Sequence, residues 1–121
     1  MGSDPYPKSW KWSAEAHPKR LSEWVTAPDR AGFYELGFMK GQFAPMYCGR
    51  AAGVTLRARL RQHYLRSHNA NVRKYSNDLW YRYKVFDTFE LAAFVEAVHI
   101  AAFQYEWNNR NEWAKHWALE T

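Results

Sequence analysis

Gly32-Phe33-Tyr34 and Tyr47-Cys48-Gly49 are the two tyrosine triplets that decide the fold of this 121-residue chain. Each lies in a stretch typical of a β-strand, because polar and apolar side chains alternate over 31–39 and apolar residues dominate 45–49. The Lys40-Gly41-Gln42 segment between these stretches has the composition of a turn. We therefore predict a β-hairpin with one of the two tyrosines on each strand.

The rest of the chain predicts helices and one further strand. Leu56, Leu60 and Tyr64 recur at helical spacing after Thr55, which indicates a helix with these side chains buried. The later elements expected are a short helix at 72–75, a strand at 79–86, a helix at 89–103 and a closing helix around Trp113 and Trp117. The predicted fold class is α+β, a small three-stranded antiparallel sheet flanked by helices.

Residues 1–30 differ from the rest because they are rich in proline. Within them, Leu21, Trp24 and Val25 predict one short helix that ends near Pro28. We therefore expect an N-terminal extension at 1–30 and a single domain at 31–121, which a chain of this length can accommodate.

The positive charge of the chain is unevenly distributed. The formal net charge is +5, and no acidic residue occurs between Glu35 and Asp78. Such a basic stretch is typical of a protein that binds a polyanion, so DNA is the expected partner, with a solvated charged face as the simpler alternative. The residues expected to contact substrate are Arg50, Arg57, Arg61, Arg66, Arg73 and Lys74.

Several classes of protein are excluded by composition. A single cysteine excludes an intrachain disulfide and a multi-thiolate zinc site. No apolar run approaches the ~20 residues of a membrane span, and the N-terminus lacks the apolar segment of a signal peptide. We expect a cytoplasmic protein without a membrane partner.

Glu96 is the most unusual single position, because its neighbours on the predicted helix are small and mostly apolar. An ionised carboxylate is costly in such surroundings unless a charge offsets it, and a divalent cation is one such charge. The alternative is that Glu96 lies on the exposed stripe of an amphipathic helix.

Other polar and aromatic residues are candidates for chemistry. Arg59 and His63 are one helical turn apart, where a guanidinium can bind a phosphate and an imidazole can orient a water or transfer a proton. The alternatives are a solvated arginine and a ring at the edge of the core. Tyr34 and Tyr47 are expected side by side across the hairpin, either near a cation or as simple cross-strand packing. Asn108 is a candidate phosphate or backbone ligand, or else an ordinary loop residue.

Taken together, these residues resemble the GIY-YIG nuclease superfamily, which is named after its two tyrosine triplets. The family pattern continues with an arginine and a Tyr or His on the first helix, a glutamate on a later helix and a C-terminal asparagine. Phe33 and Cys48 depart from the usual aliphatic residues of the triplets. The histidine variant is similar to the small restriction-enzyme branch. The matching positions are Tyr34, Tyr47, Arg59, His63, Glu96 and Asn108.

The resemblance implies a DNA endonuclease, a phosphodiester hydrolase that uses one Mg²⁺ or Mn²⁺ held by Glu96. It also implies that Tyr34, assisted by Tyr47 or His63, takes the proton from the attacking water, although which tyrosine is the base stays open. Arg59 and Asn108 would bind and position the scissile phosphate. A non-catalytic nucleic-acid-binding module on the same fold is the alternative, and both a monomer and a homodimer are compatible with the sequence.

Overall fold

The predicted hairpin is formed by strands β2 (Gly32–Lys40) and β3 (Gln42–Ala51), which pair antiparallel. Gly41 joins them with a φ of +78°, which glycine adopts without strain. The computed structural model describes residues 17–51, 53–103 and 105–108. The other elements are β1 (Lys19–Arg20), the 3-10 helix η1 (Leu21–Thr26), α1 (Leu56–Arg66), α2 (Ala70–Tyr75), β4 (Trp80–Val85) and α3 (Phe89–Phe103).

The sheet has four strands in the order β1-β4-β2-β3, and all neighbouring pairs are antiparallel. The α+β class is therefore confirmed, whereas the prediction of three strands is wrong. The additional strand, β1, is two residues long and pairs Lys19 with Tyr81 and Arg20 with Trp80. So short a strand leaves no alternation in the sequence, because that signal needs about four residues or more.

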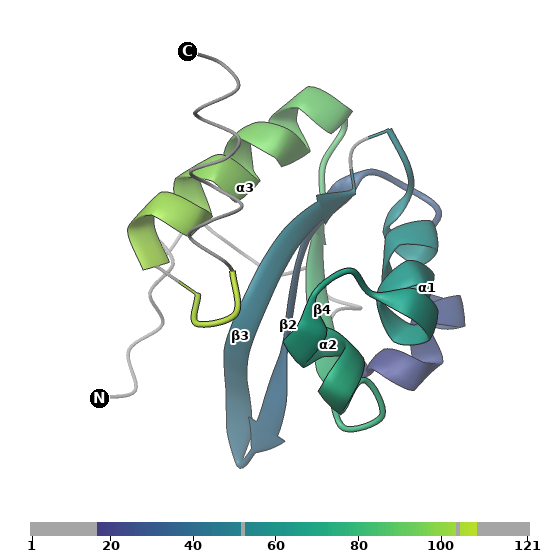
Figure 1. The fold of residues 1–121 in the computed structure, drawn as a ribbon. Coiled ribbons are helices and arrows are strands. Elements are labelled where there is room, and N and C mark those ends of the chain that lie inside the picture. The colour runs from purple at the N-terminus through teal and green to yellow at the C-terminus, as the bar shows by residue number, and fades with distance from the viewer. Residues whose placement is uncertain (1–16, 52, 104, 109–121) are drawn as a thin grey trace.

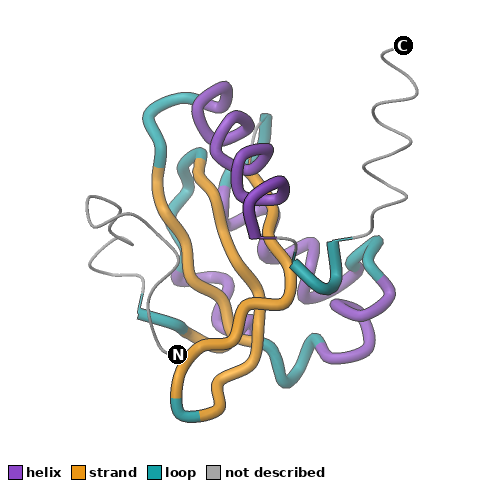
Figure 2. The backbone as a smooth tube through the Cα atoms, turned by 90° about the vertical axis from the view of Figure 1, so that its left-hand side faces the viewer, coloured by secondary structure: helices purple, strands orange, loops and turns teal. Residues whose placement is uncertain are grey.

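Helices cover both faces of the sheet (Figure 1). α3 lies on one face, where it contacts β2 and β3, and α1 lies with α2 and η1 on the other. Figure 2 looks onto the face that α3 covers, with the orange strands behind this helix. None of the helices in the described part of the chain combines the length and the apolar character that crossing a membrane requires.

Alternation along β2 supplies two separate cores. Tyr34 and Leu36 belong to the larger core beneath α1, whereas Phe33 packs in a smaller core with Cys48 and Tyr105. Phe33 and Cys48 are both completely buried. The two departures from the family's aliphatic pattern are thus apolar side chains in the smaller core, whereas Tyr34 and Tyr47 belong to the larger one.

α1 begins at Leu56 because Thr55 caps it, its hydroxyl oxygen accepting a hydrogen bond from the Ala58 N–H at 3.2 Å. The buried side of α1 carries Leu56, Leu60 and His63. Leu56 and Leu60 are thus buried as predicted, whereas Tyr64 is only partly buried and His63 is the third buried side chain of the helix.

The segment before β2 is part of the packed structure. Leu21 is completely buried in the larger core, and its N–H donates to the Leu79 carbonyl at 2.8 Å. η1 occupies the place where Leu21, Trp24 and Val25 predicted a short helix. The closing helix predicted around Trp113 and Trp117 lies outside the described residues.

We predict that Leu21→Ala destabilises the protein by about 2–5 kcal/mol, because it opens a cavity in the main core. Val25→Ala on the same short helix is the control; Val25 is 61% exposed, so its truncation should change the free energy of unfolding by less than about 0.5 kcal/mol. Urea denaturation measures both. Equal, small losses would mean that this segment does not contribute to the stability of the domain.

Candidate active site

Tyr34 and His63 form a buried pair between β2 and α1. The phenol oxygen of Tyr34 lies 2.6 Å from His63 Nε2, and both side chains are 1% exposed. Across the hairpin, Tyr34 faces Gly49, where a Cβ atom would lie 2.3 Å from the phenol oxygen. The glycine of the second triplet therefore leaves room for the tyrosine of the first.

Tyr47 lies on the same face of the sheet as Tyr34, but the two are not directly opposed. The register pairs Tyr47 with Leu36 and Tyr34 with Gly49, so the two tyrosines are diagonal neighbours across the hairpin. Both rings instead contact His63 edge-on, with centroid distances of 5.5 Å for Tyr34 and 5.3 Å for Tyr47. The imidazole is the point at which the two tyrosines meet.

His63 is a neutral imidazole. Burial lowers its pKa to about 3, and the nearby His68 and Arg59 act in the same direction. Its second ring nitrogen, Nδ1, lies 2.8 Å from the hydroxyl oxygen of Ser67, which is itself buried. Both ring nitrogens are therefore hydrogen-bonded inside the protein, and neither needs solvent.

The Tyr34 phenol is also neutral in the resting structure. Burial raises the pKa of Tyr34 well above its ordinary value, and the proximity of Tyr47 adds to the rise. The positive charge of Arg59 acts in the opposite direction. Additional positive charge or hydrogen-bond donation near the phenol oxygen is what ionisation of this group requires.

Arg59 is the arginine of α1 whose charge reaches the site. Its positive charge acts to lower the pKa values of Tyr34, His63 and Glu96. In Tyr34 and Glu96 this influence opposes the larger rise caused by burial. One of its terminal nitrogens, Nη1, donates to Gln62 at 2.9 Å. Its Nε is buried and has no hydrogen-bond partner within the described residues. Because buried donors are normally paired, this N–H group is available to bind an acceptor from a ligand.

The neighbouring arginines of α1 face a different element. Arg57 donates to the Ala27 carbonyl at 2.9 Å, and the guanidinium of Arg61 lies 5.7 Å from the ring centre of Trp24 in η1. Both therefore interact with the segment around η1.

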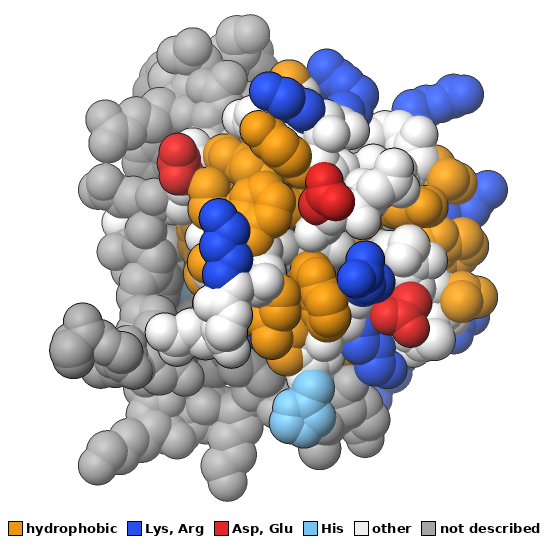
Figure 3. Space-filling model, turned by 90° about the horizontal axis from the view of Figure 1, so that it is seen from below, with side chains coloured by type: hydrophobic (Ala, Val, Ile, Leu, Met, Phe, Trp, Pro, Cys, Tyr) orange, Lys and Arg blue, Asp and Glu red, His pale blue; other side chains and the backbone are white. Residues whose placement is uncertain are grey.

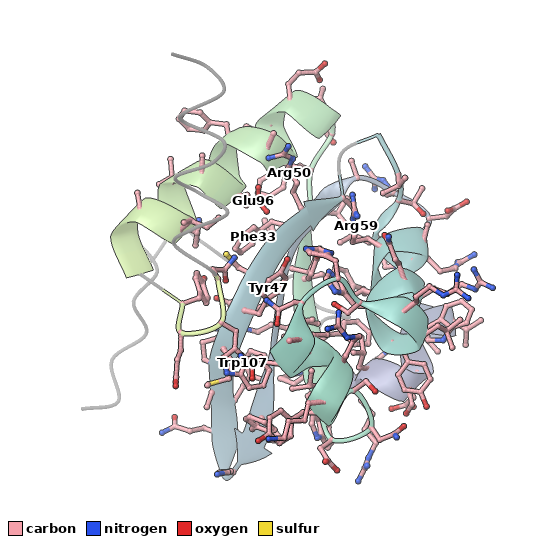
Figure 4. All side chains as sticks on the ribbon, in the orientation of Figure 1. Phe33, Tyr47, Arg50, Arg59, Glu96 and Trp107 are labelled. Atoms are coloured by element: carbon pink, nitrogen blue, oxygen red, sulfur yellow. The ribbon has the colours of Figure 1, made fainter. Side chains whose placement is uncertain are left out.

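Glu96 enters from α3 and pairs with Arg50 of β3. Arg50 Nη1 donates to Glu96 Oε1 at 2.7 Å, and the glutamate side chain is only 17% exposed. Burial raises the pKa of Glu96, while the guanidinium groups of Arg50 and Arg59 oppose the rise. Figure 4 shows Glu96 and Arg50 close together on the α3 side of β3, with Arg59 entering from the α1 side.

The donor set around Glu96 fits a hard divalent cation that keeps most of its waters. A single carboxylate with low exposure suits Mg²⁺, which dehydrates reluctantly and often binds proteins through one or two carboxylates. Within the described residues there is no cluster of three or more His, Cys, Asp or Glu side chains that could form a closed metal cage. Glu96 is therefore the residue that would hold the ion.

Asn108 is bonded to the backbone of the second triplet. Its side-chain oxygen accepts from the Cys48 N–H, and its side-chain nitrogen donates to the Cys48 carbonyl, each at 2.9 Å. The adjacent Trp107 N–H donates to the Met46 carbonyl at 2.8 Å. The segment after α3 thus fixes the edge of β3 on both sides of Tyr47.

The remaining basic candidates lie beyond this cluster. Arg66 and Lys74 are exposed, and Arg73 donates to the Ser67 carbonyl at 2.8 Å. On the face drawn in Figure 3, Lys and Arg side chains are spread among hydrophobic and acidic ones. The Lys and Arg side chains do not form one continuous patch on that face.

Sequence reasoning missed two sets of residues. Ser67 and Asn69 link His63 to the end of the described chain, and only three-dimensional contacts reveal them. Glu35 is completely buried and accepts hydrogen bonds from Arg82, at 2.6 Å, and from Tyr105. The signal for Glu35 was available, because it is an acid inside an apolar strand pattern.

The fold is shared with a set of solved structures. The GIY-YIG N-terminal endonuclease domain of UvrC from Thermotoga maritima, bound to its catalytic divalent cation, magnesium, is 25% identical with a TM-score of 0.61, over 75% of this chain and 98% of that one. One point mutant of that domain has a TM-score of 0.60 at 22% identity, over 75% and 98% of the two chains. Another has 0.58 at 24% identity, over 75% and 97%. No family model and no curated protein matches the sequence.

The chain thus has the α+β fold of a GIY-YIG endonuclease domain. This similarity confirms the resemblance to the GIY-YIG superfamily that the two tyrosine triplets indicated.

We predict that Gly49→Ala destabilises the protein by about 1–3 kcal/mol, because the new methyl group overlaps the Tyr34 ring. Urea denaturation of a double-mutant cycle with Tyr34→Ala isolates the cause. Removal of the ring should abolish most of the penalty of Gly49→Ala. An unchanged penalty in the Tyr34→Ala background would show that the contact with Tyr34 is not responsible.

Proposed function

We propose that this protein is a divalent-metal-dependent endonuclease that hydrolyses DNA phosphodiester bonds with one cation per site. The observation that carries the proposal is the meeting of Tyr34, Tyr47 and His63 on one face of the hairpin, with Arg59 beside them. Glu96 approaches the same end of β3 from the opposite helix layer. The similarity to a magnesium-bound endonuclease domain supports the same conclusion.

Glu96 holds the cation in this proposal. A bound Mg²⁺ or Mn²⁺ supplies positive charge for the leaving oxygen and the phosphate in the transition state. Arg50 neutralises Glu96 in the present structure. With Glu96 engaged by a metal, the guanidinium of Arg50 would be free to bind a phosphate oxygen beside the site.

Tyr34 is the proposed general base, because it is the phenol that is hydrogen-bonded to His63. Arg59 binds the scissile phosphate in this scheme, and its buried Nε is a donor suited to that task. Asn108 acts as a positioning residue through its two hydrogen bonds to Cys48, which hold β3 beside Tyr47.

The second candidate function is a non-catalytic nucleic-acid-binding module. The ion pair between Arg50 and Glu96 favours it, because an internal counter-ion can satisfy a buried acid permanently. Cleavage assays on plasmid, single-stranded and branched DNA with Mg²⁺, and then with EDTA, distinguish the two functions. Binding without cutting would support the module. The domain at 31–121, the cytoplasmic location and the choice between monomer and homodimer stay predictions.

We predict that Glu96→Ala leaves the fold intact and lowers the cleavage rate by about 100-fold or more, because the metal loses its protein ligand. Glu90→Ala is the matched control, since Glu90 lies exposed on the first turn of the same helix. Circular dichroism reports folding, and plasmid nicking reports the rate. Cutting by Glu96→Ala at the wild-type rate would refute the metal assignment.

We also predict that Arg59→Ala reduces turnover by about 100-fold, whereas Arg61→Ala changes it by less than about threefold. The two residues share α1, but only Arg59 affects the pKa values of the site residues, while Arg61 lies against Trp24. Single-turnover cleavage with saturating Mg²⁺ measures both. Equal losses would mean that the two arginines act only as general positive charge.

A further inference from the structure

A buried chain of hydrogen bonds runs from the protein backbone to the Tyr34 phenol. The Asn69 N–H donates to the Ser67 hydroxyl oxygen at 3.1 Å. That oxygen lies 2.8 Å from His63 Nδ1, and His63 Nε2 lies 2.6 Å from the phenol oxygen. Ser67 is 2% exposed and Asn69 is 7% exposed.

The chemistry of the donors determines where the protons lie in this chain. A backbone N–H can only donate, so the Ser67 oxygen acts as the acceptor for Asn69. Within the described residues, the only acceptor in hydrogen-bond contact with the Ser67 hydroxyl proton is His63 Nδ1. If Nδ1 carried a proton instead, the buried hydroxyl would lose its acceptor, which costs about 1–3 kcal/mol.

The charge of the ring completes the assignment. His63 is neutral at physiological pH, so one ring nitrogen is a donor and the other is an acceptor. Because Nδ1 accepts from Ser67, Nε2 must carry the hydrogen. The Tyr34 oxygen is then the acceptor of the bond from His63, and the hydrogen of the neutral phenol can be donated to the attacking water of the proposed mechanism.

We propose that Ser67 is a positioning residue that fixes His63 in the Nε2–H tautomer, so that His63 donates a hydrogen bond to Tyr34 and does not take its proton. This inference rests on the proposed role of Tyr34 as the general base. A hydrogen bond donated to the phenol oxygen favours the phenolate, which is the form that can accept a proton. Tyr34 first loses its phenol proton to solvent water. When the phenolate then accepts the proton of the attacking water, an O–H bond of the water breaks and an O–H bond forms on Tyr34, while the N–H of His63 stays in place.

The surroundings of Ser67 hold its hydroxyl in this orientation. Asn69 is anchored because its side-chain nitrogen donates to the Trp107 carbonyl at 2.8 Å. Its side-chain oxygen caps α2 by accepting from the N–H groups of Asn71 and Val72. The Ser67 carbonyl accepts from Arg73 at 2.8 Å. The residue that sets the tautomer is therefore itself fixed by α2 and by the segment after α3.

The test is a long-range ¹H–¹⁵N NMR correlation on the full chain labelled with ¹⁵N-histidine, recorded without metal or DNA. The wild type should show His63 with its hydrogen on Nε2, assigned by the loss of its signals in His63→Gln. Tyr34→Phe should keep the same tautomer, because Ser67 sets it. A wild-type spectrum with the hydrogen on Nδ1 would overturn the proposal, and so would a change of tautomer in Tyr34→Phe.

Variants of Ser67 complete the test. Ser67→Ala should produce a mixture of tautomers or the Nδ1–H form, Ser67→Thr should restore the Nε2–H form, and Ser76→Ala, near the end of α2, should change nothing. Should Ser67→Ala fail to fold, Ser67→Cys keeps the shape with a weaker donor and should give the mixture. Retention of the Nε2–H form in the soluble alanine or cysteine variant would refute the proposal.

Cleavage by the same variants connects the tautomer with turnover. Ser67→Ala should slow cleavage by about tenfold, as expected if the pKa of the base rises by about one unit. Ser67→Thr should restore the rate. An unchanged rate despite a changed tautomer would overturn the link to Tyr34. The NMR result does not depend on cleavage, so an inactive wild-type protein with the Nε2–H form would refute the nuclease function and leave the tautomer assignment standing.

Discussion

The hydrogen bond between Tyr34 and a neutral, buried His63 is the interaction on which the rest of the site depends. It requires β2 to present Tyr34 toward α1, and it requires α1 to bury the histidine one turn after Arg59. It also requires a glycine at position 49, because any side chain there overlaps the phenol. The two triplets are therefore one packing arrangement: the tyrosine of the first fills the space that the glycine of the second leaves empty.

The edge strand β3 connects the two layers of helices. Tyr47 points from it toward His63 beneath α1, while Arg50 pairs with Glu96 from α3. Opposite faces of one strand thus contribute to the same site, and the strand must be held firmly. Asn108 and Trp107 provide this support through hydrogen bonds to the backbone of β3. An edge strand has unpaired backbone groups, and here the chain satisfies several of them itself.

Sequence patterns predicted the elements that bury an apolar stripe. The hairpin and α3 lie where alternation and helical spacing indicated, and the capped start of α1 places Arg59 and His63 one turn apart. The patterns could not predict β1, which is too short to alternate. They also could not predict the exact register of Tyr34 and Tyr47, because it depends on the bulge between Leu36 and Gly37.

The hydrogen bonds around the site were beyond sequence reasoning for a different reason. Ser67, Asn69 and Trp107 are ordinary loop residues in the sequence, and their importance arises only when the segment before α2 meets the segment after α3. The Arg50–Glu96 pair likewise joins residues that are 46 positions apart. Contacts between residues so far apart cannot be predicted from the periodicity of the sequence, since periodicity indicates only which side of one helix or strand is buried.

The Arg50–Glu96 pair also explains how a lone carboxylate can be kept largely buried without a cation. Desolvation raises the pKa of Glu96, and a carboxyl without a counter-charge would tend to become neutral and lose its value as a metal ligand. Arg50 opposes this rise, and Arg59 contributes to the same effect from the other helix layer. The Nη1 group of Arg50 occupies Oε1 of Glu96, so a cation that binds this oxygen would compete with the ion pair. In the proposed function, a guanidinium freed in this way would be available to bind a phosphate of the substrate.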